Sequence, residues 1–425
     1  MIKMKNKVSA KEIYFWNLLG NLMFAGSSAI FMMIVSRLSS AKMADVFSLA
    51  YGIAGILVVL GLFQVRTYQG TDVTFKHSFT SYTIARVFSI TLMLITLFPY
   101  LFLVHFDFSD TSKLAVVILY VLFRMCEAIS DLFQGLFQQH ERLDIAGKSM
   151  TIRYGASIFI LLISLVVLKS LEVSLLILFL FNFVFVWIYD FPKSLSFDKA
   201  SFDKSSIRLQ VKDAFVILKG CIPLFISGFL LAYIFNEPKI AIDKAIQLGK
   251  LAEGLQRNYN ILFMPVFFMS LFILILRPLT TSLAIQWQRK EFAKFDRTVK
   301  QIGIYLLGGG AILTMLAFLI GTPVLSIVFG VDLAGDALTL TILVFSGILY
   351  SAGIVLGDIL TIFRMQRKLL VVYLLMFVVS IAITNPFVMS KGLLGASYSF
   401  LFVMLIYSIG SYLTYIKVRK WKGKL

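Results

Sequence analysis

The chain has 425 residues, of which 59% are hydrophobic and 15% are charged, and its formal net charge is +18. Soluble domains usually have about 45–50% apolar and about 25% charged residues, so this composition excludes an ordinary soluble protein and predicts a membrane protein with many spans. The positive charge does not indicate nucleic-acid binding, because the basic residues are spread over short segments and form no basic domain.

Apolar runs near the length needed to cross a hydrocarbon layer follow one another along the chain and predict twelve transmembrane helices. The first run follows basic residues, as in a signal peptide, but no A-x-A cleavage site follows it, so we expect an uncleaved span. The fifth and sixth runs are separated so briefly that a tight hairpin is expected. The runs are 13–35, 43–65, 83–104, 114–138, 151–168, 171–189, 214–235, 259–279, 302–329, 337–362, 369–389 and 393–416.

Lysine and arginine are concentrated in every second connecting segment. This bias predicts a membrane protein with both termini in the cytoplasm. A long polar stretch near the middle leaves six spans on each side, which predicts an all-α protein with an N-terminal six-helix bundle over 1–190, a cytoplasmic linker over 191–213 and a C-terminal six-helix bundle over 214–425. Bundles of equal span number would be related by a pseudo-two-fold axis along the membrane normal.

The fourth run, 114–138, carries a polar stripe that follows one face of a helix for about four turns. Its arginine would lie near the bilayer midplane, where a charge costs at least about 2.5–3.5 kcal/mol, so the stripe should face a bundle interior or a wet cavity. One interpretation is a structural arginine–glutamate pair, and the other is a cavity lining for a polar substrate. The length of the stripe favours the second. The stripe consists of Arg124, Glu127, Asp131, Gln134 and Gln138.

Two further cations, Lys219 and Arg277, fall within apolar runs near their expected cytoplasmic ends. Either they reach the interface along their aliphatic stems, or they point inward and extend a cationic lining that could bind a diphosphate. The predicted substrate-binding residues are therefore Arg124, Gln134, Gln138, Lys219 and Arg277. Acids within a bilayer mark ion relays, so the predicted sites for a coupling Na⁺ or proton are Glu127, Asp131 and Asp358.

The sequence offers no sign of an enzyme. No phosphate-binding G-x-x-x-x-G-K-[ST] loop and no catalytic motif is found, so ATP hydrolysis by this chain is not expected. Neither the two cysteines nor the three histidines have the spacing of metal ligands, so no metal site and no cofactor beyond a coupling ion is predicted.

Several stretches, quoted at the end of this paragraph, are similar to one family. The chain resembles the Wzx-type polysaccharide flippases of the multidrug/oligosaccharidyl-lipid/polysaccharide exporter superfamily. The resemblance implies two six-helix bundles around a central cavity, alternating access, and ion-coupled flipping of undecaprenyl-diphosphate-linked oligosaccharide from the cytoplasmic to the outer leaflet. Arg124, Glu127 and Gln134 match a cavity-facing fourth helix in such proteins. The stretches are SSAIFMMIVSRLSSAKMADVFSLAYGI, RTYQGTDVTFKHSFTSYTIAR, FRMCEAISDLFQGLFQQHERLD, GTPVLSIVFG and GLLGASYSFLFVMLIY.

Three alternatives remain open. Drug exporters of the superfamily often carry an acid in the first span, whereas this first span has Asn21 and no acid after Glu12. A flippase for a teichoic-acid or cell-wall lipid precursor fits the same features, and a membrane glycosyltransferase or polymerase would need larger outer loops. The expected partners are the lipid-linked glycan, membrane lipid, a polysaccharide polymerase and glycosyltransferases, and the protein itself is expected to be a monomer.

Overall fold

The structure is a computed structural model that describes the chain outside residues 1–8, 73, 198–206, 364, 366–367 and 423–425; within it, the side chains of 267–281 and 421–422 are not described. The described residues form helices joined by short turns, with no strand among them. They divide into two compact units, Met1–Phe229 and Leu230–Leu425.

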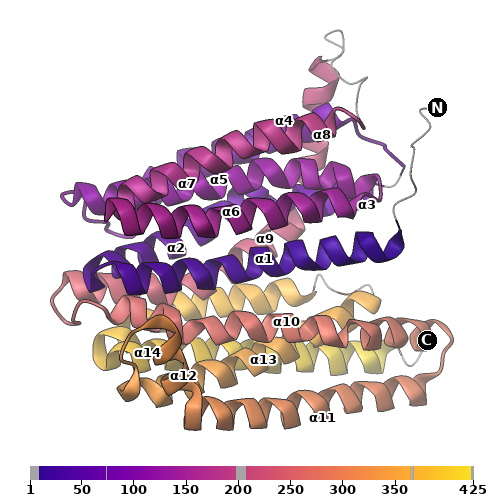
Figure 1. Cartoon of the computed structure of the whole chain (residues 1–425). Coiled ribbons are helices and arrows are strands. Elements are labelled where there is room, and N and C mark those ends of the chain that lie inside the picture. Colours follow the sequence, from indigo (N-terminus) through magenta and orange to yellow (C-terminus); the bar gives the residue numbers. More distant parts are fainter. Residues whose placement is uncertain (1–8, 73, 198–206, 364, 366–367, 423–425) are drawn as a thin grey trace. The chain divides into compact units, whose positions relative to one another are not determined.

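The long helices of the first unit run side by side (Figure 1). A short segment, α3, continues the second long helix after a break, and the last helix of the series, α9, crosses the boundary into the second unit. The elements are α1 (Ala10–Leu38), α2 (Ala41–Leu62), α3 (Val65–Thr71), α4 (Phe79–Leu103), α5 (Thr111–Gln139), α6 (Leu143–Leu168), α7 (Leu171–Phe185), the π-helical turn η1 (Val186–Asp190), α8 (Phe191–Ser194) and α9 (Ile207–Gln247).

The second unit continues with a further set of long helices. Its elements after α9 are α10 (Leu255–Gln288), α11 (Phe292–Leu316), the π-helical turn η3 (Ala317–Gly321), α12 (Thr322–Phe329), the 3₁₀ turn η4 (Ala334–Asp336), α13 (Ala337–Ile362) and α14 (Leu369–Lys422).

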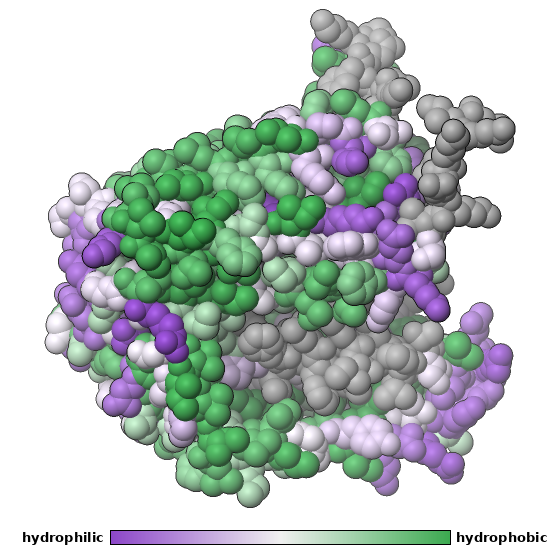
Figure 2. All heavy atoms as spheres, in the orientation of Figure 1, coloured by the Kyte–Doolittle hydropathy of each residue, from purple (hydrophilic) through white to green (hydrophobic). Residues whose placement is uncertain are grey.

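The twelve expected spans coincide with these helices. Among the described residues, nine helices are long and apolar enough to cross a membrane by length and composition. One of them, α14, contains two expected spans, and α5 and α10 supply the others. Over the first unit, hydrophobic side chains cover much of the helices and hydrophilic ones gather toward the helix ends (Figure 2). The chain is therefore a multi-pass membrane protein.

Two turns between spans depend on left-handed backbone. The expected hairpin between the fifth and sixth spans is formed by Lys169, which ends α6 at φ 53°, and by Ser170, whose side chain caps α7. The last two spans are continuous in α14 except at Gly392, where φ is 57° and ψ is −132°. Only glycine adopts this conformation readily, so Gly392 separates the two spans without a loop.

The expected division of the chain, with a cytoplasmic linker over 191–213, remains a prediction. Helix α8 lies in the first part of that linker, residues 198–206 are outside the described part, and α9 begins at Ile207. The boundary between the two compact units falls after Phe229, within α9.

The fourth span of each half lies at the centre of its unit. Helix α5 contacts α2, α3, α4, α6 and α7, and α13 contacts α10, α11 and α14. Because α5 is enclosed by neighbouring helices, polar groups on it can face protein instead of lipid.

Both π-helical turns have the same physical cause. Pro192 and Pro323 stand at the first turns of α8 and α12, just after η1 and η3. A proline ring clashes with the carbonyl four residues earlier, and here that carbonyl lies inside the π-helical turn. The wider turn therefore accommodates each proline without ending the span.

Helices α1 and α6 approach each other through glycine. A Cβ atom added at Gly147 would overlap the backbone carbonyl of Trp16, and one added at Gly20 would lie 2.7 Å from the carbonyl oxygen of Gly147. Small residues at such crossings let two membrane helices pack backbone against backbone.

Replacing Gly147 by alanine is expected to lower the free energy of unfolding by about 1–3 kcal/mol, because the backbone of α1 cannot move away without losing its packing. The measurement is thermal or denaturant unfolding of the purified protein in detergent. Gly155→Ala on the same helix is the matched control, since a Cβ atom there would meet only Met23 Cε at 3.5 Å. Equal effects of the two substitutions would contradict this account of the crossing.

Candidate functional site

The polar stripe of α5 faces into the first unit. Glu127 and Gln134 are 7% and 3% exposed, and the side chains of Arg124 and Asp131 are each 16% exposed. The stripe is therefore an internal polar surface on an otherwise apolar helix.

Arg124 and Glu127 form a closed ion pair, with Nη1 2.6 Å from Oε2. Both are on α5, three residues apart, where side chains of a helix meet. The hydroxyl groups of Tyr51, Tyr120 and Tyr154 interact electrostatically with the guanidinium group. In this structure each charge of the pair is thus neutralised by the other.

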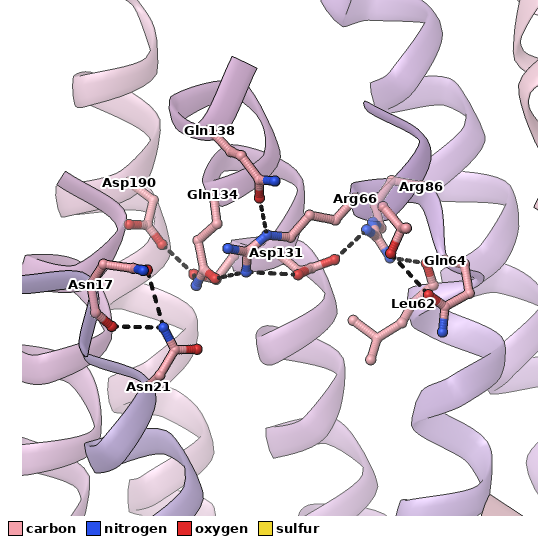
Figure 3. A network of polar contacts seen from close by, with 12 residues as sticks. Asn17, Asn21, Leu62, Gln64, Arg66, Arg86, Asp131, Gln134, Gln138 and Asp190 are labelled. Atoms are coloured by element: carbon pink, nitrogen blue, oxygen red, sulfur yellow. Dashed lines mark hydrogen bonds and ion pairs between the residues drawn. The ribbon is translucent and has the colours of Figure 1, made fainter. Parts of the chain in front are cut away.

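Asp131 lies between two arginines (Figure 3). Its Oδ2 is 2.7 Å from Nη2 of Arg86, which is on α4, and its Oδ1 is 3.3 Å from Nη1 of Arg66, which is on α3. One carboxylate of α5 therefore joins two other helical segments.

The helix that supplies Arg66 is broken directly before it. Helix α2 ends at Leu62, and the next two residues, Phe63 and Gln64, have left-handed backbone with φ of 43° and 57°. Neither is glycine, so each conformation is strained and persists only because the surrounding structure holds it.

Arg86 satisfies the carbonyl groups that the break leaves without helical partners. Its Nη1 donates to the carbonyl oxygens of Gly61 at 2.6 Å and Leu62 at 2.8 Å, and Ser89 Oγ also donates to Gly61. A cation at the C-terminal end of a helix is favourable because the helix dipole is negative there. Arg86 is buried, so it fixes the end of α2 to Asp131.

Arg66 is held mainly by amide groups. Its Nη1 donates to Gln134 Oε1 at 2.5 Å and its Nε donates to Gln138 Oε1 at 3.2 Å. Glycine allows α3 to approach α5 here, because a Cβ atom at Gly70 would lie 2.5 Å from Nε2 of Gln138. The side chain of Arg66 is 25% exposed, more than those of Arg86, Arg124 or Asp131.

A buried carboxylate, Asp190, extends the network from the other side of the stripe. Its oxygens accept hydrogen bonds from Ser130 Oγ at 2.7 Å and Ser149 Oγ at 2.6 Å, and Gln134 Nε2 donates to Ser130 Oγ. Asp190 is the last residue of the π-helical turn η1. The proline-induced turn thus positions this acid toward α5 and α6.

A fourth guanidinium group, that of Arg153 on α6, connects the two ends of the network. It is buried, donates to the hydroxyl of Tyr154 and interacts electrostatically with Asp190 and Glu127. We refer to the charged residues of this network as the arginine cluster. Its members are Arg66, Arg86, Arg124, Arg153, Glu127, Asp131 and Asp190.

The remaining predicted site residues lie elsewhere. Lys219 is exposed on α9, and no contact to α5 is found for its side chain among the described residues. The side chain of Arg277 lies outside the described residues. Asp358 is half-buried on α13 in the second unit, where it acts electrostatically on Tyr373 and Tyr407. The roles expected for these residues remain predictions.

Sequence reasoning counted Arg66, Arg86 and Arg153 among the basic residues of the segments that connect the spans, and it gave Asp190 no role. A signal for Arg86 was present, because Ser78 is a favourable N-cap and starts α4 before its apolar run. That start places Arg86 about two turns inside the helix. No comparable signal marks Arg66, whose position depends on the backbone break.

The loop after α3 is ordered around Asp72. Its carboxylate accepts hydrogen bonds from the backbone amides of Lys76 and His77 and from the hydroxyl of Tyr82. Burial favours a higher pKa for Asp72, but these hydrogen bonds outweigh it and hold the pKa below its usual value. His77 in turn lies 2.7 Å from Asp213 of α9. Through the contact of His77 with Asp213, the loop that follows α3 is attached to the first part of α9.

Comparison with solved structures identifies the fold. The chain is similar to a multidrug resistance MATE family transporter of the MOP superfamily in its inward-facing conformation, with TM-score 0.61, 14% identity and coverage of 99% of this chain and 97% of that one. The lipid II flippase MurJ gives TM-score 0.61 and 12% identity over 96% of this chain and 89% of that one. The Vibrio cholerae MATE transporter VcmN gives 0.59 and 13%, over 97% of both chains.

The chain has the fold of these transporters. It is an all-α membrane protein with twelve transmembrane helices in two six-helix bundles. No protein-family model matches the sequence, and no curated protein matches it either.

Replacing Arg86 by alanine is expected to destabilise the protein by about 3–5 kcal/mol, because the substitution breaks a buried charged pair and removes the guanidinium donor of the Leu62 carbonyl group, while the Gly61 carbonyl group keeps only Ser89. Arg66→Ala should cost less than about 1 kcal/mol, since Asp131 keeps Arg86 as its partner. Unfolding of each variant in detergent measures the difference. Similar losses for both would show that the two arginines hold Asp131 equally.

Proposed function

We propose that the protein is a flippase that moves an undecaprenyl-diphosphate-linked oligosaccharide from the cytoplasmic to the outer leaflet by alternating access. The observation that carries the proposal is the arginine cluster, in which four guanidinium groups accompany three carboxylates inside the first unit. Guanidinium groups bind phosphate oxygens through paired, charge-assisted hydrogen bonds, so such a cluster suits a diphosphate.

The likeness in fold to the lipid II flippase MurJ supports a lipid-linked substrate. A substrate of this kind combines a charged diphosphate and a polar glycan with an apolar tail. The polar interior around α5 suits the first two parts, and the hydrophobic outer face of the helices suits a tail that stays in the lipid. A flippase for a teichoic-acid or cell-wall lipid precursor belongs to the same proposal, because its substrate carries the same chemical groups.

Coupling to Na⁺ or a proton is part of the proposal. Glu127 and Asp131 are each paired with a guanidinium group. In the proposed coupling, a cation takes the place of the guanidinium group at one of these carboxylates. Asp358 is the corresponding expected group of the second unit, and Lys219 and Arg277 are the expected additional cations for the substrate.

The remaining expectations concern the setting of the protein. We propose that it acts as a monomer in a bacterial plasma membrane with both termini in the cytoplasm. There it would receive its substrate from glycosyltransferases and deliver it to a polysaccharide polymerase. The proposed activity is transport without bond formation, and therefore not enzymatic.

A cation-coupled multidrug exporter is the second candidate. The likeness in fold to multidrug resistance MATE transporters favours it. Against it stands the charge of the arginine cluster, since a surplus of guanidinium groups repels cationic drugs. In addition, Glu12 is the only acid in α1, and it pairs with Lys148.

Expression of the chain in bacteria that lack a capsule or O-unit flippase is expected to restore glycan export and to stop lipid-linked repeat units from accumulating in the inner leaflet. Arg124→Ala should abolish this rescue at equal membrane abundance, because Glu127 is then left without its partner inside the unit and the charge pair proposed for ion coupling is broken. The measurement is the amount of surface glycan together with the inner-leaflet pool.

Arg208→Gln is the matched control, since Arg208 is exposed at the start of α9 and should leave the rescue intact. Unchanged export with Arg124→Ala would contradict the assigned role of Arg124. Failure to rescue across several glycan backgrounds, combined with new resistance to cationic dyes, would favour the exporter.

A further inference from the structure

The arginine cluster contains more guanidinium groups than carboxylates. Glu127 pairs with Arg124, and Asp190 interacts with Arg153. The third carboxylate, Asp131, is shared by Arg86 and Arg66. With four guanidinium groups and three carboxylates, the cluster has at least one positive charge without a carboxylate of its own, and the geometry around Asp131 shows which arginine can supply it.

The geometry around Asp131 identifies this arginine. Arg86 lies 0.6 Å closer to the carboxylate than Arg66, at 2.7 Å against 3.3 Å. Arg86 is also buried and bonded to two backbone carbonyl groups at the end of α2. Its position is required by the broken helix, so it cannot leave Asp131 without exposing those carbonyls to an apolar interior.

Arg66 has none of these restraints. Its shortest contacts are to the neutral amide oxygens of Gln134 and Gln138, and its side chain is 25% exposed. If Arg66 moves away, Asp131 remains neutralised by Arg86. An anion can therefore replace the contacts of Arg66 without leaving a buried charge unpaired.

From this we infer that Arg66, with Gln134 and Gln138, is the anion-binding site of the first unit and that its ligand is a phosphate or diphosphate group. The guanidinium group supplies paired donors, and Gln138 can rotate its amide to present NH₂ donors to the phosphate oxygens, while Gln134, whose Nε2 donates to Ser130, orients the guanidinium group. Arg86 is the fixed counter-charge of Asp131. Arg124 lies seven residues before Asp131, or about 10 Å along α5, and is already neutralised by Glu127.

This inference deepens the proposed function, on which the choice of a lipid-linked diphosphate rests. The phosphate chemistry itself has two sources, a lipid headgroup or a free phosphate compound. Titration of the purified full-length protein in detergent with inorganic diphosphate and, separately, with undecaprenyl diphosphate distinguishes them. Binding of the lipid alone assigns the site to a headgroup, and comparable binding of both assigns it to phosphate groups in general.

Two substitutions test the residues. Arg66→Gln should weaken the binding of whichever ligand the wild type binds by at least about tenfold, because the charge that attracts the phosphate is removed. Gln138→Glu should weaken it as strongly while leaving the melting temperature unchanged or higher, since the new carboxylate pairs with Arg66 and competes with the ligand. Arg208→Gln should bind as the wild type does.

Loss of binding in Gln138→Glu with retained stability separates a binding role from a structural one. The inference is overturned if Arg66→Gln or Gln138→Glu binds as tightly as the wild type, or if the wild type binds neither ligand. Arg66-dependent binding without rescue of glycan export would instead retain the site and reject the proposed flippase. Rescue with binding that is independent of Arg66 would retain the flippase and reject the site.

Discussion

The interaction on which the first unit depends is the contact of Arg86 with the broken end of α2 and with Asp131. A helix that ends inside a membrane protein leaves carbonyl groups that need hydrogen-bond partners from the protein. Arg86 supplies both the hydrogen bonds and the positive charge that this end requires. The charge of Arg86 is in turn neutralised by the carboxylate of Asp131. The break in α2 and the acid on α5 are thus parts of one arrangement.

This arrangement separates structural from exchangeable charges in the same network. Arg86 and Asp131 are tied to the backbone of α2, whereas Arg66 is attached to the segment after the break and held by two glutamines. The proposed transport needs both kinds of charge, because the protein must keep its structure while its ligand enters and leaves. The strained residues Phe63 and Gln64 lie between the end of α2, where Arg86 is bound, and α3, which carries Arg66.

The positions of the helices could be predicted from the sequence, because apolar length and loop charge are strong constraints in a membrane. The polar face of 114–138 could be predicted for the same reason, as could the tight turn at Lys169. The partners of that face could not. Arg66 reaches it because the chain breaks at Phe63–Gln64, where neither residue is glycine or proline, and Asp190 reaches it through a π-helical turn set by Pro192. Such contacts depend on tertiary structure that helical periodicity does not contain.

The glycine contact between α1 and α6 also limits how the first unit can deform. Where two backbones touch at Gly20 and Gly147, the helices have no side chains between them that could change rotamer and permit sliding. Helices α1 and α6 should then move together as one rigid body. Arg153 of α6 would move with this rigid body, and the environment of Asp190 would change with it. Arg66 belongs to α3, which follows the backbone break at Phe63–Gln64. A rearrangement that moves α1 and α6 relative to α3 would therefore change the distance between Arg153 and Arg66, and so alter the electrostatic field around the arginine cluster.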